Sequence, residues 1–144
     1  MAGKNPYEVM PLSRDRLEAF SALLQAEATL WKEKLYWDFT PTTSVIEAAV
    51  KINNLPGLIA MAGSDALGYI YWVKQREKAI VGSLFSRPGE RNREIDLELL
   101  GKSLTRLFGD STVRRIEGQL LYFGSAQLDD LLTQKGFTQY TRCQ

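Results

Sequence analysis

The residues that could carry out chemistry in this chain do not include histidine. Histidine is the usual general base, the usual partner in a catalytic triad and the commonest metal ligand in proteins. Catalysis by this chain would therefore use carboxylates, tyrosine or water. Ser83 has no histidine to activate it and is not predicted to be a nucleophile. The sequence predicts no metal site.

The segment from Leu84 to Leu100 joins a predicted strand to a predicted helix. A helix N-terminus binds phosphate through its free N–H groups and the positive end of its dipole, and glycine lets the backbone approach the anion closely. Asn92, Glu94 and Asp96 place side chains there instead, and the two acids supply the negative charge that the dipole favours. We expect this junction to decide what the domain does.

Three arginines, Arg87, Arg91 and Arg93, lie in the same segment. They form either a phosphate-binding cluster or a solvated loop in which they pair with Glu90 and Glu94. The interleaving of opposite charges favours the solvated loop.

Composition and charge narrow the class of protein. The 144 residues have the size of one domain with one core. A formal net charge of +1 gives no general field to attract nucleic acid or an anionic membrane. No apolar run approaches the roughly 20 residues of a membrane span. Cys143 is the single cysteine, which excludes an internal disulfide, so we expect a soluble cytoplasmic protein.

Hydrophobic periodicity predicts alternating strands and helices. A strand over 7–12 precedes a helix whose apolar residues recur from Leu17 to Trp31. A capping-box pattern from Ser44 to Glu47 predicts that a second helix begins there and ends near Asn54.

The rest of the chain continues the alternation. Three strands are predicted to form an antiparallel meander, over 58–61, 67–74 and 79–85. The elements predicted after them are a helix from 95 to 108, a strand over 115–123, a short helix over 127–135 and a last strand over 137–142.

The order of these elements resembles the GNAT superfamily of acetyl-coenzyme A dependent N-acetyltransferases, and so does the junction. In that family a strand ends in an apolar residue and a proline, and Arg-Gly-x-Gly-x-Gly opens the next helix. Pro88, Arg91, Ile95, Leu99 and Leu100 match this pattern. The resemblance covers nearly the whole chain and implies a mixed α/β fold with a mostly antiparallel central sheet flanked by helices. It also implies acetyl-CoA as cofactor and a small-molecule or peptide amine as acceptor.

The resemblance implies catalytic roles for particular groups. Glu117, or a water molecule, would take a proton from the amine. Pairing of Glu117 with Arg114 or Arg115 is the competing interpretation and is favoured. Backbone amides after Phe85 would polarise the thioester. The side chains that would bind the cofactor are Arg87, Arg91, Asn92 and Arg93.

An acceptor groove is implied between the early helices and the central strands, with Trp37, Asp38 and Tyr71 as its predicted lining. Core and interface packing is the favoured alternative for the aromatic residues of this region as a set. Gly82 is expected to mark a strand bulge, where the pantetheine arm of the family's cofactor pairs with the backbone.

Three features depart from the family pattern. Asn92, Glu94 and Asp96 occupy the glycine positions, and Leu132 stands where active members have a tyrosine that acts as general acid. The chain also ends at Gln144, before the strand that family members add last. Together these features predict one degenerate, non-catalytic domain in an acetyltransferase, its sheet completed by a second GNAT domain or a second copy. With a second domain, this chain would be the amino-terminal half of a tandem GNAT protein. The alternative is an active N-acetyltransferase with a divergent cofactor loop.

Overall fold

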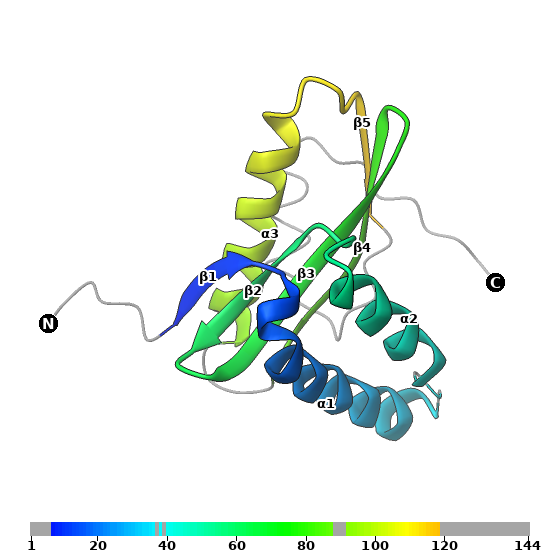
Figure 1. The fold of residues 1–144 in the computed structure, drawn as a ribbon, viewed down its shortest axis with the longest axis vertical. Helices are drawn as coiled ribbons and strands as arrows, with labels where there is room; N and C mark the ends of the chain where they lie inside the picture. Colours follow the sequence, from blue (N-terminus) through cyan, green and yellow to red (C-terminus); the bar gives the residue numbers. More distant parts are fainter. Residues whose placement is uncertain (1–6, 37, 39, 88–91, 119–144) are drawn as a thin grey trace, which may run out of the picture.

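A computed structural model of the chain describes residues 7–36, 38, 40–87 and 92–118 (Figure 1). Its strands and helices follow one another in the order predicted from the sequence. They are β1 (Glu8–Pro11), a 3-10 turn η1 (Arg14–Arg16), α1 (Leu17–Leu35), α2 (Thr40–Lys51), β2 (Gly57–Ala62), β3 (Asp65–Gln75), β4 (Lys78–Ser86), α3 (Asn92–Phe108) and β5 (Arg115–Gly118).

The described strands form one sheet in the order β1-β2-β3-β4-β5. The pairs β1–β2, β2–β3 and β3–β4 are antiparallel, so the predicted meander from β2 to β4 is confirmed. β5 pairs with β4 in parallel, because α3 carries the chain back before β5 begins. The mixed α/β fold with a mostly antiparallel sheet is therefore confirmed.

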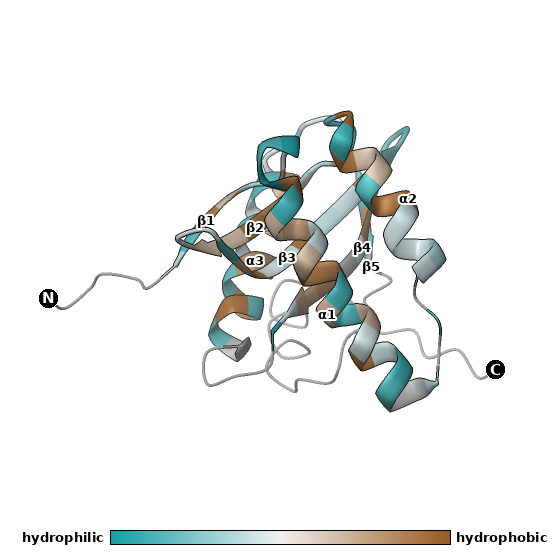
Figure 2. Ribbon diagram, turned by 60° about the horizontal axis from the view of Figure 1, so that its bottom comes forward, coloured by the Kyte–Doolittle hydropathy of each residue, from teal (hydrophilic) through white to brown (hydrophobic). Residues whose placement is uncertain are grey.

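Helices cover both faces of the sheet, α1 and α2 on one side and α3 on the other (Figure 1). The apolar residues of α1 and α2 alternate with hydrophilic ones, as expected for amphipathic helices (Figure 2). Inside, the first core lies under α1 and α2 and the second under α3. β3 supplies buried side chains to both, Tyr69 to the first and Ile70 to the second, as its apolar character on both faces predicted.

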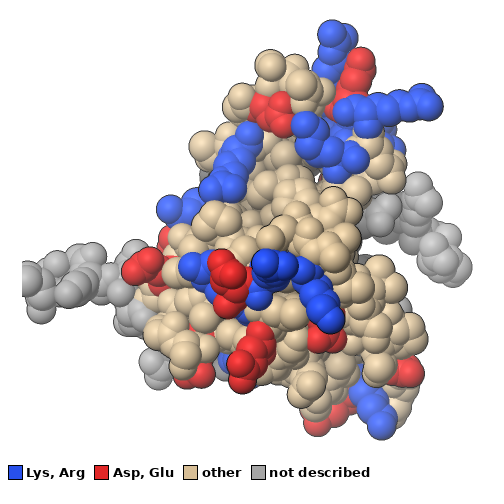
Figure 3. Space-filling model, in the orientation of Figure 1, with Lys and Arg blue, Asp and Glu red and all other residues tan. Residues whose placement is uncertain are grey.

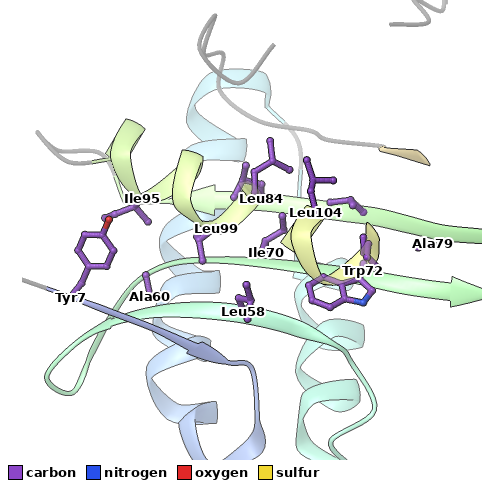
Figure 4. Packing of buried hydrophobic residues seen from close by; sticks show 13 residues of the cluster. Tyr7, Leu58, Ala60, Ile70, Trp72, Ala79, Leu84, Ile95, Leu99 and Leu104 are labelled. Carbon is purple, nitrogen blue, oxygen red and sulfur yellow. The ribbon is translucent and has the colours of Figure 1, made fainter. Parts of the chain in front are cut away.

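The core under α3 shows how this helix is held to the sheet. Ile95, Leu99 and Leu104 project from α3 toward Leu58 and Ile70 of the strands (Figure 4). All five side chains are buried. This packing fixes the position of the N-terminus of α3 relative to the end of β4.

The predicted start of α2 is wrong. The helix begins at Thr40, so Ser44 already lies inside it and its hydroxyl donates to the Thr40 carbonyl oxygen (3.2 Å). Asp38 accepts a hydrogen bond from the Thr40 backbone N–H (3.0 Å), as a helix cap does. The Glu47 carboxylate is not part of a capping box, because it accepts from the Ser21 hydroxyl on α1.

Two irregularities interrupt the pairing of β3 with its neighbours. Tyr71 lies opposite Ser83 and Trp72 opposite Val81, which leaves Gly82 as an extra residue in β4. The predicted bulge at Gly82 is therefore confirmed. A second bulge, at Leu67, shifts the register between β2 and β3.

The predictions for residues 119–144 lie outside the described residues. They are the end of the strand over 115–123, the helix over 127–135, the strand over 137–142 and the residues Leu132 and Cys143. Within the part that the structure describes, no helix combines the length and hydropathy needed to cross a membrane.

Candidate functional site

A carboxylate near the N-terminus of α3 contacts the end of strand β4. Asp96, in the first turns of α3, is half-buried and receives a hydrogen bond from Ser86 at the end of β4. Burial raises the pKa of the Asp96 carboxyl to about 6, although the Ser86 bond acts in the opposite direction. Its Oδ1 atom is buried and has no hydrogen-bond partner among the residues described.

Two further carboxylates lie close by on the same helix. The buried Tyr7 hydroxyl donates to Glu98 Oε1 at 2.8 Å and approaches Glu94 Oε1 at 3.4 Å. Burial and these two carboxylates raise the pKa of Tyr7, so Tyr7 remains a proton donor. The first turns of α3 therefore carry three acids, at a helix end that binds phosphate in other proteins.

Arg87 is held by backbone groups next to the bulge at Leu67. Its Nε atom donates to the Ala66 carbonyl oxygen (2.9 Å), and its backbone N–H donates to the Leu67 carbonyl oxygen (2.8 Å). The Nε–H is thus already used inside the domain. Asn92 and Arg93, two other predicted cofactor ligands, are the first residues of α3. The structure does not describe their side chains, and it does not describe Arg91.

The predicted base, Glu117, is engaged in ion pairs on β5. Its carboxylate lies 2.8 Å from Arg115 Nε and 3.5 Å from Lys78 Nζ. The pairing with Arg115 is the interpretation that the sequence favoured. Lys and Arg side chains gather with acids between them over the β3–β4 hairpin and the start of β5, which Figure 3 shows at the top of the molecule.

Residues on the α1 side of β3 form a cluster around a buried carboxylate that the sequence analysis missed. Glu27 of α1 is 1% exposed and accepts hydrogen bonds from the Tyr69 hydroxyl and from Trp31 Nε1, the latter at 3.1 Å. Burial raises the pKa of Glu27, although both hydrogen bonds lower it. Glu27 lies on the apolar stripe of α1 that contains Phe20 and Leu24. An acid on such a stripe is the sequence feature that could have indicated a buried carboxylate.

Tyr71 connects this cluster to the bulge in β4. Its ring is stacked with that of Tyr69, with centroids 6.3 Å apart, and is half-buried. Burial and the nearby charge of Glu27 raise the pKa of Tyr71. The ring lies directly over Gly82, where an added Cβ would be 2.4 Å from Tyr71 Cε1. The Tyr71 ring therefore packs against the bulge at Gly82.

Gly82→Ala tests this close contact. The new methyl group forces the Tyr71 ring to turn away, and we expect unfolding to become about 1 to 2 kcal/mol easier, a usual cost for overpacking. Urea unfolding followed by circular dichroism measures the effect. In a Tyr71→Ala background the same change should cost much less, because no ring is left to displace. An unchanged cost there would show that the bulge itself rejects alanine.

The other residues predicted for the groove, Asp38 and Trp37, and Phe85, predicted for the cofactor site, have different places. Asp38 is exposed, and its hydrogen bonds with Thr40, which hold the pKa of its carboxyl below the ordinary value, belong to the start of α2. Phe85 is buried in the core under α1 and α2. Trp37 lies outside the described residues. No group of acids or cysteine that could hold a metal ion occurs in the part of the chain described.

The solved structures similar to this chain include several N-acetyltransferases. The chain matches a ribosomal-protein-alanine N-acetyltransferase from Brucella melitensis biovar Abortus 2308 with a TM-score of 0.64 and 12% identity, over 96% of each chain. It matches the PaiA N-acetyltransferase from Thermoplasma acidophilum, in complex with coenzyme A, with a TM-score of 0.66 and 18% identity, over 92% of this chain and 89% of that one.

A third similar structure is the aminoglycoside N-acetyltransferase AAC(6')-Iy in complex with CoA. Its TM-score is 0.63 and its identity 16%, over 99% of this chain and 95% of that one. No family model matches the sequence, and no curated protein matches it significantly. The likeness therefore rests on three-dimensional structure, and it shows that this chain has the fold of the GNAT N-acetyltransferases.

Proposed function

We propose that this chain is a non-catalytic GNAT-like domain of a protein whose complete form is an acetyl-CoA-dependent N-acetyltransferase. The observation that carries the proposal is the Asp96 carboxyl, folded against Ser86 at the N-terminus of α3. With a pKa of about 6, this group is mostly charged at pH 7. A pyrophosphate at this helix end would meet like charge from Asp96, Glu94 and Glu98, so the residues present do not fit it.

Two other engaged side chains support the proposal. Arg87 donates its Nε–H to the Ala66 carbonyl oxygen, so fewer of its guanidinium N–H groups are available to a phosphate. Glu117 is paired with two cations, Arg115 and Lys78, so its carboxylate is already engaged at the β4–β5 edge of the sheet. Both groups serve the fold of the domain itself.

Calorimetric titration with acetyl-CoA tests the proposal. We expect no saturable heat of binding up to millimolar cofactor. The informative variants are Asp96→Asn, which removes one charge, and the triple change to glycine at positions 92, 94 and 96. If the rest of the site is intact, the triple variant should gain affinity that Asp96→Asn gains only in part. Saturable micromolar binding by the natural chain would contradict the non-catalytic assignment.

An active acetyltransferase is the second candidate, and the bulge at Gly82 favours it. The family places the pantetheine arm at such a bulge, and here the half-buried Tyr71 ring lies directly beside it. In this case the acceptor is a small-molecule or peptide amine and acetyl-CoA is the donor. Release of free thiol from acetyl-CoA in the presence of an amine panel would establish this activity, and its absence at high enzyme concentration would exclude it for that panel.

The complete protein needs a catalytic partner under the first proposal. That partner is a second GNAT domain or a second copy of this chain, in the cytoplasm. Light scattering of the purified chain distinguishes a monomer from a dimer, and a monomer would leave the second domain as the partner.

A further inference from the structure

A groove of about 480 Å³ runs between the edge strand β1 and the helix α3. Its apolar wall comes from Val9, Pro11, Leu58 and Leu97. Its other wall is the exposed side of α3, from Glu98 to Arg106. A groove of this size accepts a few side chains of a peptide.

Gly101 lines this groove on the side of α3. It lies in the interior of α3, where glycine destabilises a helix relative to alanine. Neither local packing nor backbone geometry requires it, because an added Cβ would meet nothing within 4 Å and its φ is not positive. A side chain longer than that of alanine would extend into the groove at this position, since Gly101 is one of the lining residues.

The strand beside the groove has free backbone groups. The Leu12 N–H donates to the Gly57 carbonyl oxygen, which continues the β1–β2 ladder. Because an antiparallel ladder alternates, the N–H and C=O of Val9 and the C=O of Pro11 point to the outer edge. Within the described residues β1 has no neighbour on that side. Pro11 has no N–H, which restricts strand addition to the region of Val9.

The charged side chains at the groove differ in whether they are already paired. Glu98 is already engaged, by the Tyr7 hydroxyl at 2.8 Å and by Lys102 Nζ at 3.8 Å. Arg106, one turn further along α3, is exposed and makes no hydrogen bond or ion pair with the residues that the structure describes. An occupant therefore meets an uncompensated guanidinium, which favours a carboxylate.

We propose that the β1–α3 groove binds an extended peptide segment of a partner protein. One large apolar side chain of the peptide lies over Gly101, between Leu58 and Leu97. An acidic side chain two residues from it in the peptide reaches Arg106. The peptide backbone exchanges hydrogen bonds with Val9. This binding does not depend on acetyl transfer, and it does not depend on whether the domain is catalytic.

Selection from a displayed library of random peptides on the purified full chain tests the proposal. We expect the enriched peptides to combine a large apolar residue with an acidic one nearby. Fluorescence anisotropy of one labelled, synthesised peptide from the selection then measures its dissociation constant. Gly101→Leu, which fills the groove, should weaken binding at least tenfold, whereas Gly101→Ala should change it little.

Charge reversal separates this groove from other surfaces. Arg106→Glu should weaken binding about tenfold, and replacing the acidic residue of the peptide with lysine should restore it. Lys51→Glu, at the end of α2, makes the same change of charge on the opposite face and should have no effect. Thermal unfolding confirms that each variant is folded, and Arg106→Glu with its charge-reversed peptide tests the groove if the leucine variant is not.

Four outcomes would overturn the proposal, three of which concern the peptide. These three are a selection without enrichment, enriched peptides that lack an acid, and binding that survives both Gly101→Leu and Arg106→Glu. A fourth is self-association of the chain that Gly101→Leu abolishes, because the occupant would then be a second copy and not a peptide segment.

Discussion

Replacing Glu27 with leucine should lower the free energy of unfolding by about 3 kcal/mol at pH 7. The change leaves the Tyr69 hydroxyl and the Trp31 indole N–H buried without their acceptor, and each such group costs roughly 1 to 3 kcal/mol. Removal of a buried charge returns part of this cost, because burial disfavours the charged carboxylate. Urea unfolding at pH 7 gives the difference directly.

The control for this prediction removes a donor together with the acceptor. In the double variant Glu27→Leu with Tyr69→Phe, the buried hydroxyl is gone and at least a third of the lost stability should return. Glu27→Gln retains an acceptor of the same shape and should cost about 1 kcal/mol. If Glu27→Leu is as stable as the natural chain, Glu27 is not held as a buried acceptor in solution.

The Asp96→Asn variant should be more stable than the natural chain at neutral pH and equally stable in mild acid. The Asp96 pKa rises from 3.8 to about 6 on folding because of burial, so the folded state binds a proton more tightly than the unfolded state. The contribution of the Asp96 carboxyl to the free energy of unfolding is therefore most favourable below pH 4. It is lost as the pH rises through 6. The shift corresponds to roughly 2 to 3 kcal/mol.

Unfolding free energies of the two proteins at pH 4, 6 and 8 measure this effect. The difference should be near zero at pH 4, partial at pH 6 and complete at pH 8. The pKa of Glu27 is also raised, so the unfolding free energy of the Asp96→Asn variant still decreases somewhat as the pH rises. A natural chain that gains stability from pH 4 to pH 8 relative to Asp96→Asn would show that the α3 N-terminus favours the charged carboxylate.

Several local features could be predicted because they depend on neighbouring residues in the sequence. The alternation of apolar residues predicted the order of β1 to β4, and the glycine at position 82 predicted the bulge. The start of α2 was predicted wrongly because two capping signals compete. Asp38 before Thr40 is used as the cap, while Ser44 and Glu47 fit a capping box but lie within the helix.

The roles of the charged residues could be predicted only in part. Glu117 has a cation two residues away, and the favoured pairing with Arg115 is the one observed. Arg87 was expected to bind phosphate or to lie in a solvated loop, but it donates to the backbone of Ala66. That acceptor lies beside the irregular pairing at Leu67, which no local pattern revealed.

The sequence by itself determined the layered α/β fold, the single core stripe of each helix and the absence of histidine chemistry. Only the tertiary structure decided which acids are buried. Glu18 and Glu27 are both acids of α1, yet only Glu27 faces the Tyr69 hydroxyl, 42 residues further along the chain. Hydrophobic periodicity depends on the local helix geometry, whereas the solvation of a carboxylate depends on the elements that pack over it. The same reason explains why Asp96 against Ser86, and the groove over Gly101, became visible only in the folded domain.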